Sequence, residues 1–456
     1  MEYVFAQATQ SILDPDSKSG IAHYWTLQAN PLGYVWFSSI FHFLLGEPEG
    51  FWSYRLASLS GLVAILTAGA ILISDWKPDS SREFHLWCAL VTFSPLIWLF
   101  SGRGTADVLP VGLLLLSFAL ACKGEVKARG FASALFLLAI GVKYHALLLA
   151  PGFIYIFWYQ NQSRSEWGKL CGQFFLLPLT GFFLYLWVVY EQYGFFLVHE
   201  YHSQTHKFEP VNLLKTFSMY AGYLGLLLGP VAFVSILSVR KHGSGKWLLL
   251  AGVGFAVGVV SEPGQSLGEM NYGPFDWVLN HSMTFLMKGV GGVIFVFLIL
   301  DCVFEAVKHK NVVAGFILTT CLPFLLICSA TRPAQRYLIF LIPLIFFYLI
   351  FCKIKKPLIL GWGTVAIFVL GNIFAVNYQI AQARASDNMA HWLIENKLIE
   401  QTLPGSINSN SGQYFIPFAG SPKTRAVMER SGNIETSLHS EKVVVLGRTL
   451  KTYYVK

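Results

Sequence analysis

Residues 1–50 read MEYVFAQATQSILDPDSKSGIAHYWTLQANPLGYVWFSSIFHFLLGEPEG, a polar and aromatic-rich opening that is too weakly apolar to cross a bilayer. From residue 52 to about residue 378 the character changes, because one apolar run follows another with short polar connections. Such runs predict transmembrane helices. The order indicates a helical membrane protein whose opening segment lies at one membrane surface.

Composition supports the membrane class. The 456 residues are 54% hydrophobic and only 13% charged, with a mean hydropathy of +0.53, whereas soluble domains carry about 25% charged residues. The net charge of +8 lies in short clusters between apolar runs, so we expect no nucleic-acid partner. The seven cysteines are widely spaced and predict packing residues rather than a disulfide framework. The opening residues lack the features of a cleavable signal peptide.

We expect about twelve transmembrane helices, several of them short. The predicted spans are 52–74, 84–101, 108–122, 131–142, 145–159, 171–190, 214–238, 247–260, 283–304, 312–330, 337–352 and 358–378. The stretch 131–159 has a second interpretation, as one long helix. With Met1 outside, thirteen Lys and Arg fall in inner loops and five in outer loops, as the positive-inside rule expects. We therefore predict a multipass protein of the inner (plasma) membrane.

The same pattern predicts three regions. Residues 1–51 form an outer-face loop with an interfacial helix, residues 52–378 the all-α membrane domain, and residues 379–456 a small α/β domain on the periplasmic or extracellular side. In the loop, NPLGYVWFSSIFHFLL predicts a helix along the membrane surface, with a packed half-span as the alternative. In the tail, DNMAHWLIENKL has helical spacing, and KVVVLG and TYYV predict strands.

Ionisable residues gather on the predicted outer side, where they are costly unless they have a partner or a task. They are Glu2, Arg103, Asp107, Lys143, His145, His199, Glu200, His202, Arg332 and Arg336. Arginines bind phosphate oxygens bidentately, and a carboxylate can take a proton from an acceptor hydroxyl. The set therefore suits a reaction on a lipid-linked phosphate.

Most of these residues also have an interpretation without catalysis. Asp107 can cap the helix that follows it, and Arg103 can simply be its partner. Lys143 can extend its ammonium group to the membrane interface. Arg332 and Arg336 can be loop charges that fix only the orientation of the chain.

The histidines of the loop near residue 200 raise the question of a metal. His199, Glu200 and His202 match no standard zinc signature. Contact with the acceptor is therefore the first interpretation and a divalent metal the second, and no cofactor is certain. Asp301 and Glu305, at the predicted inner end of a span, are interpreted as boundary residues.

Five motifs occur in an order that resembles a known family. EYVFAQA is similar to Asp-Glu-x-x-Tyr/Phe-x-x-x-A, NPLGYVWFSSIFHFLLG to P-P-L-x-Y-W-x-x-x-x-x-x-L-x-G, and YRLASLSGL to A-R-L-P-S-x-x-x-G-L. GRGTADVLP provides the loop with an Arg and an Asp, and QRYLIFLIP is similar to R-Y-L-L-P-x-L-P. The chain thus resembles the GT-C glycosyltransferases that use polyprenyl-phosphate sugars, which include protein O-mannosyltransferases and lipid A aminoarabinose transferases.

The resemblance implies an inverting glycosyltransferase of cell-envelope glycans. It would move one sugar from a polyprenyl-phosphate donor to a lipid, glycan or protein acceptor, among membrane lipids and without a nucleotide. The implied catalytic residues are Glu2 and Asp107. From the ionisable residues themselves we expect substrate binding by Arg103, Lys143, His199, Glu200, His202, Arg332 and Arg336.

Three departures from the family accompany the likeness. The family's catalytic Asp precedes the Glu that matches Glu2, where this chain has Met1, and the family has one further span before this loop. We expect that the true start lies upstream; the alternative is that this copy lacks its catalytic base and is weak or inactive. Asn30 occupies the place of the Lys found in the aminoarabinose transferases.

Two other functions are compatible with a polytopic envelope protein. A transporter or flippase predicts helices broken at mid-membrane and internal repeats, and the sequence shows neither. A polysaccharide polymerase or ligase would need arginine-rich outer loops facing two lipid-linked glycans.

Overall fold

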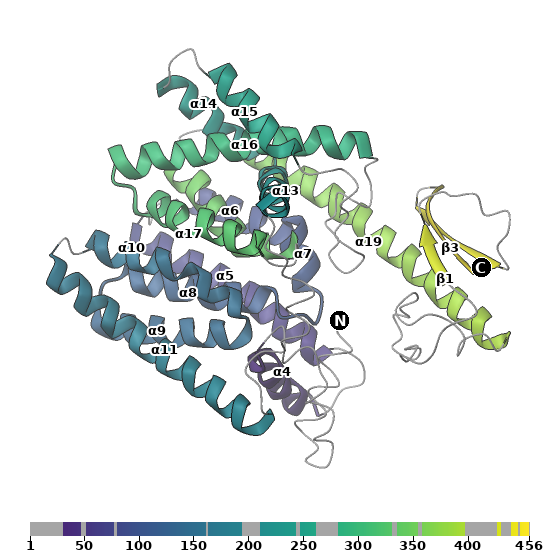
Figure 1. The fold of residues 1–456 in the computed structure, drawn as a ribbon, viewed down its shortest axis with the longest axis horizontal. Coiled ribbons are helices and arrows are strands. Elements are labelled where there is room, and N and C mark those ends of the chain that lie inside the picture. The colour runs from purple at the N-terminus through teal and green to yellow at the C-terminus, as the bar shows by residue number, and fades with distance from the viewer. Residues whose placement is uncertain are drawn as a thin grey trace. The chain divides into compact units, whose positions relative to one another are not determined.

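The computed structural model describes residues 31–46, 52–76, 80–160, 163–193, 210–242, 247–260, 281–330, 335–353, 358–396, 426–429, 439–445 and 447–455. Its contacts divide the chain into two compact units, and the division falls inside helix α19 (Leu358–Glu395), after Phe368. Figure 1 shows the ribbon.

The first unit is helical throughout its described part. Its α-helices before α19 are α4 (Gly33–Leu44), α5 (Trp52–Trp76), α6 (Ser81–Phe93), α7 (Pro95–Ser101), α8 (Val108–Cys122), α9 (Val126–Val142), α10 (Ala150–Gln160), α11 (Arg164–Tyr193), α13 (Pro210–Leu228), α14 (Phe233–His242), α15 (Trp247–Val259), α16 (His281–Lys308), α17 (Val312–Ser329) and α18 (Ile342–Phe347). Short 3-10 segments are η2 (Tyr144–Leu149), η3 (Pro230–Ala232) and η5 (Gln335–Phe340), and η6 (Tyr348–Lys353) is π-helical.

Five helices among the described residues are long and apolar enough to cross a membrane. They comprise Trp52–Asp75, Ser165–Glu191, Phe285–Lys308, Val312–Ser329 and Ile359–Tyr378, and the number rises to seven if two bent pairs each count as one span. Val108–Cys122, Trp247–Val259 and Ile342–Lys353 are shorter apolar helices. The chain is thus an all-α multipass membrane protein in its main unit, and the total of about twelve spans stays a prediction.

Two predicted spans are broken, which corrects the expectation of unbroken helices. The span predicted at 84–101 bends by 66° between α6 and α7, where Ser94 is extended (ψ 127°) ahead of Pro95, as residues before proline commonly are. The span at 214–238 bends by 98° between α13 and α14. There Gly229 has a φ of +64°, and the backbone N–H of Val231 donates to Thr364 Oγ1 at 2.9 Å.

Small residues set how closely the central helices pack. Gly61 of α5 and Gly112 of α8 lie against each other's helix, and a Cβ on Gly112 would stand 2.3 Å from the Gly61 oxygen. Gly225 of α13 and Gly291 of α16 pack in the same way, and a Cβ on Gly225 would stand 1.9 Å from the Gly291 oxygen. Such close backbone approach is how membrane helices gain packing energy without a hydrophobic driving force between them.

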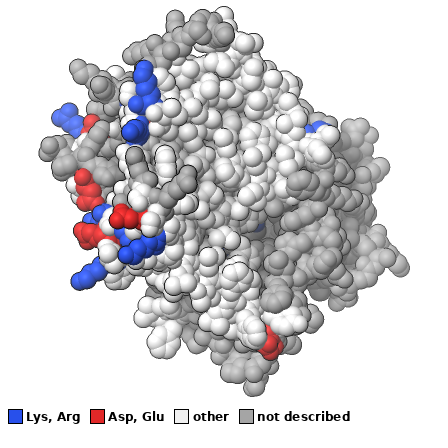
Figure 2. Space-filling view, turned by 60° about the vertical axis from the view of Figure 1, so that its left-hand side comes forward, with Lys and Arg blue, Asp and Glu red and all other residues white. Residues whose placement is uncertain are grey.

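The outer surface of the first unit suits lipid. Figure 2 shows one face on which charged side chains gather along one edge while the middle is white. Only 17% of the apolar stretch of α11 is buried inside the protein. Its Phe183, Leu184 and Trp187 are each more than 60% exposed. An apolar helix so exposed in water would be unfavourable, whereas lipid chains solvate it.

The second unit combines the end of α19 with a small sheet. The strands β1 (Ala426–Glu429), β3 (Arg448–Val455) and β2 (His439–Val445) lie side by side in that order and pair antiparallel. Trp392 of α19 stacks on His439 of β2, with ring centroids 4.5 Å apart. The predicted strands KVVVLG and TYYV fall largely on β2 and β3, while the boundary predicted after residue 378 lies inside the unbroken α19.

Candidate functional site

Three segments that are distant in sequence meet at one end of the first unit. Asp107 directly precedes α8, Lys143 directly follows α9, and Arg336 lies in η5. Together with His145 and Tyr337 we call these residues the Asp107 cluster. Each member lies at the start or end of an α-helix or in a 3-10 segment. Its side chain is therefore positioned by a break in the regular α-helical backbone.

The backbone at Lys143 explains how this side chain enters the site. Its φ of −156° and ψ of 121° are extended and end α9, and the 3-10 segment η2 follows at once. Pro151, in the first turn of α10, has no N–H with which to continue an α-helix through η2. The stretch predicted as 131–159 is therefore two helices separated at Lys143, not one long helix.

The centre of the cluster is a buried ion pair. Lys143 Nζ donates to Asp107 Oδ1, and both residues are 2% exposed. Arg336 Nε lies 3.9 Å from the same oxygen. Asp107 occupies the N-cap position of α8, but in the described structure its side chain makes no cap hydrogen bond. The interpretations of Asp107 as a cap and of Lys143 as an interfacial lysine are therefore wrong.

Aromatic rings cover the two cations. Lys143 Nζ lies 5.1 Å, and Arg336 Cζ 5.8 Å, from the centroid of the Tyr337 ring. The His145 ring stacks on Tyr337 at 4.1 Å. A desolvated cation over a ring face gains about 2 kcal/mol or more from this arrangement. Tyr337 therefore lies against both cations of the Asp107 cluster.

The cluster carries one more cation than anion. Burial by itself would raise the pKa of Asp107, but Lys143 and Arg336 outweigh this effect and hold its pKa below the usual value. With Asp107 ionised, Lys143 and Arg336 both face this carboxylate within the described part of the chain. Cations gathered at one place attract anions.

The helix α4 reaches the cluster through hydroxyl groups. Tyr34 Oη donates to the Tyr54 carbonyl at 2.6 Å and lies 2.8 Å from Ser58 Oγ. Ser58 Oγ in turn lies 2.9 Å from the Thr105 carbonyl oxygen and accepts from the Thr105 N–H at 3.2 Å. These residues belong to the motifs NPLGYVW, YRLASLSGL and GRGTADVLP, which the fold thus brings together.

The other candidates divide into two groups. Arg103 is half-exposed in the loop that carries Asp107, while the ion pairs of Asp107 within the described structure are with Lys143 and Arg336. Outside the described residues lie Glu2, His199, Glu200, His202 and Arg332. Among the described residues no group of three or more His, Cys, Asp or Glu is arranged to hold a metal.

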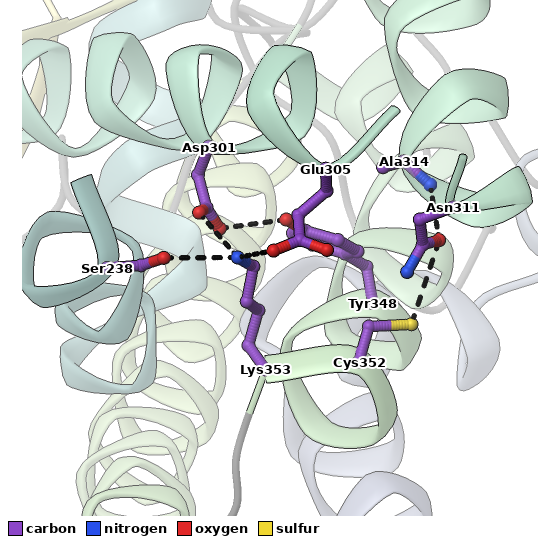
Figure 3. A network of polar contacts seen from close by, with 8 residues as sticks. All are labelled: Ser238, Asp301, Glu305, Asn311, Ala314, Tyr348, Cys352 and Lys353. Atoms are coloured by element: carbon purple, nitrogen blue, oxygen red, sulfur yellow. Dashed lines mark hydrogen bonds and ion pairs between the residues drawn. The ribbon is translucent and has the colours of Figure 1, made fainter. Parts of the chain in front are cut away.

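A second polar network was missed by the sequence interpretation (Figure 3). Lys353 Nζ lies 2.7 Å from Asp301 Oδ1, 2.5 Å from Glu305 Oε1 and 3.1 Å from Ser238 Oγ. The Tyr348 hydroxyl donates to Asp301 Oδ2 at 2.8 Å. Asp301 and Glu305 are therefore bonded partners that tie α16 to η6 and α14, not mere boundary residues. The sequence feature that could have revealed this network is a pair of carboxylates one helical turn apart within an apolar run.

Comparisons with known proteins gave a limited result. No protein-family model and no curated protein matches the chain. Two solved structures are similar, those of ArnT from Cupriavidus metallidurans in the apo state and bound to undecaprenyl phosphate. Each has 14% sequence identity and covers 100% of this chain and 93% of its own, with TM-scores of 0.42 and 0.40.

Proposed function

We propose that this chain is an integral-membrane glycosyltransferase of the GT-C type. It would move a sugar from a polyprenyl-phosphate donor to a hydroxyl of a lipid, glycan or protein at the outer face of the inner membrane. The observation that carries the proposal is the convergence of Lys143 and Arg336 on one buried carboxylate, Asp107. The motif resemblance supplies the class of donor.

The proposed chemistry begins at the donor phosphate. Lys143 and Arg336 bind its oxygens, and the phosphate competes with Asp107 for the two cations. The acceptor oxygen attacks the anomeric carbon and loses its proton to a carboxylate, assigned to Glu2 by the resemblance. The bond between that carbon and the phosphate oxygen breaks, and the polyprenyl phosphate leaves with the negative charge. The two cations stabilise this charge as it develops.

Asp107 has two roles in this scheme. In the resting site it neutralises Lys143, so that the lysine can remain buried and ionised. Once the donor phosphate binds Lys143, the carboxylate is released to orient a sugar or acceptor hydroxyl. The donor phosphate thus replaces Asp107 as the anion bound to Lys143 and Arg336.

Sugar transfer in membranes tests the proposal. Membranes that contain the wild-type chain, given a panel of radiolabelled polyprenyl-phosphate sugars, should transfer label from one of them. Lys143→Ala and Arg336→Ala should each lower transfer at least tenfold, at about 1.4 kcal/mol for each factor of ten. The matched exposed residues Lys127 and Arg82 provide controls, and their alanine variants should behave as wild type.

Two results would overturn the proposal. One is the absence of transfer from every sugar of the panel. The other is a Lys143→Ala protein that is folded and transfers as fast as wild type, since a phosphate site cannot lose its buried cation without effect.

Transport without chemistry is the second candidate, because two bent helix pairs occur in the described structure. Broken helices in transporters commonly surround a substrate site. Here, however, the Val231 N–H at the larger bend is bonded to Thr364, so this amide is occupied by the protein. Movement of a labelled polyprenyl-phosphate sugar across sealed vesicles, without transfer to an acceptor, would favour this candidate.

A further inference from the structure

The first turn of α4 contacts both segments that carry the buried ion pair. On one side its Tyr34 joins Ser58 of α5, and Ser58 bonds both backbone groups of Thr105, two residues before Asp107. On the other side Gly33 packs on the end of α9. A Cβ on Gly33 would stand 2.3 Å from the Gly141 oxygen and 3.0 Å from the Val142 nitrogen, immediately before Lys143.

We propose that Tyr34 and Ser58 are positioning residues, which hold the Thr105–Asp107 backbone so that the carboxylate stays against Lys143. Neither hydroxyl contacts the ion pair itself in the described structure. They act through Thr105, and α4 acts as a brace between the loop before α8 and the end of α9. The kinetic part of this inference rests on the proposed glycosyltransferase function, and the structural part does not.

Burial makes this arrangement specific. Tyr34 and Ser58 are both 0% exposed, so a hydroxyl that loses its partner here finds no water to replace it. Ser58 donates its one hydroxyl hydrogen to the Thr105 carbonyl, and its oxygen accepts the Thr105 N–H and lies 2.8 Å from the Tyr34 hydroxyl oxygen. An unmade buried hydrogen bond is costly, and the loop can avoid the cost only by moving.

A third contact fixes the same turn of α4. The Leu32 N–H donates to the Tyr185 hydroxyl of α11 at 3.2 Å, and Trp36 meets the Tyr185 ring edge-on at 6.4 Å. The brace is thus attached to α5, α9 and α11 by separate residues. Removal of one hydroxyl should loosen the Asp107 side of the site without releasing α4 from the bundle.

Chemical labelling of lysine tests the structural part in the full chain. Acetic anhydride is added to the purified membrane protein, and mass spectrometry follows each lysine. In the wild type, Lys143 should react slowly because it is buried and paired. Tyr34→Phe and Ser58→Ala should each increase its labelling rate about tenfold, the factor that corresponds to one lost hydrogen bond. The double variant should add little, since both hydroxyls act through Thr105.

Internal and matched controls separate positioning from general destabilisation. The Lys353 side chain is 7% exposed and also ion-paired, so its labelling should stay at the wild-type rate. Within the described structure, Ser38 of α4 and Ser60 of α5 donate to carbonyls of their own helices, those of Tyr34 and Ala57. Their alanine variants should leave the labelling rate of Lys143 at the wild-type value. Unchanged Lys143 labelling in both Tyr34→Phe and Ser58→Ala, or an equal rise at Lys353, would overturn the inference.

Kinetics then tests the effect on the reaction. With a donor that the wild type uses, Tyr34→Phe and Ser58→Ala should lower kcat about tenfold without raising KM, because the phosphate-binding cations remain in place and a loosened Asp107 competes less well for them. A wild type without transfer would count against the proposed function but leave the labelling result intact. Normal kcat in both variants, with labelling raised, would show that Asp107 position does not govern the reaction and would reject the kinetic part.

Discussion

At the scale of single residues, the Asp107–Lys143 pair decides the character of the site. Two charges buried at 2% exposure are tolerated because each neutralises the other and Arg336 and Tyr337 enclose them. Removal of one partner leaves a buried charge without compensation, which usually costs about 3–5 kcal/mol. The pair therefore holds the site together only while both members are present.

A double-mutant cycle measures this coupling. Asp107→Asn and Lys143→Met should each lower the free energy of unfolding, measured by thermal unfolding in detergent. The loss in the double variant should be about 1–3 kcal/mol smaller than the sum of the two single losses. Arg82→Ala, at an exposed position, serves as the control. Strictly additive losses would show that the two side chains do not interact.

The depressed pKa of Asp107 gives a dependence on pH with a defined sign. A carboxyl whose pKa is lower in the folded protein adds stability above its unfolded pKa of about 3.9, and loses this contribution as the pH falls through its folded pKa. The stability difference between wild type and Asp107→Asn should thus be constant from pH 8 to about pH 5 and shrink in stronger acid. Thermal unfolding in detergent at each pH checks this, and a difference that grows in acid would contradict it.

At the scale of elements, the ends and bends of helices carry the polar contacts. Lys143 follows α9, Asp107 precedes α8, and Lys353 ends η6. Backbone regularity stops at such places, so side chains from separate helices can converge there. The helix interiors, in contrast, pack through glycine and apolar contacts.

The network around Lys353 predicts unequal roles for its two carboxylates. Asp301 is 1% exposed and bonds both Lys353 and Tyr348, whereas the side chain of Glu305 is 15% exposed and, among the described residues, pairs with Lys353. Asp301→Asn should therefore cost about 3–5 kcal/mol, and Glu305→Gln about 1 kcal/mol. Melting temperatures of the two variants check the order, which equal losses would contradict.

Helix positions were more predictable than helix partners. The apolar run 108–122 coincides with α8, and 312–330 with α17, because burial in lipid selects apolar residues throughout a span. The bend at Gly229 was missed because it depends on Thr364, which lies 133 residues from Val231. Charge counting placed Asp107, Lys143 and Arg336 on one membrane side, but it could not show that they touch. The partners of Asp301 were missed because charges at the ends of apolar runs look like loop residues.

At the scale of the whole molecule, the alternation of helices predicts which ends share a membrane face. The predicted orientation puts Leu45, after α4, on the outer side with the Asp107 cluster, and Lys308, at the end of α16, on the inner side with the Lys353 network. In intact cells, Leu45→Cys should react with a membrane-impermeant thiol reagent, while Lys308→Cys should react only after permeabilisation. The wild-type chain gives the background labelling of the native cysteines. Labelling of Lys308→Cys in intact cells, with Leu45→Cys labelled only after permeabilisation, would contradict the proposed orientation.

The position of Lys143 directly after α9 restricts where this chain can change in length. Each residue added to an α-helix turns everything beyond it by about 100° and advances it by about 1.5 Å. One insertion between Arg129 and Gly141 would swing the lysine out of phase with its carboxylate and lift Gly141 from Gly33 at the same time. The same insertion at Gly124, ahead of the helix, preserves that phase. Length variation among natural homologues should therefore gather before residue 126 and be missing from the helix itself.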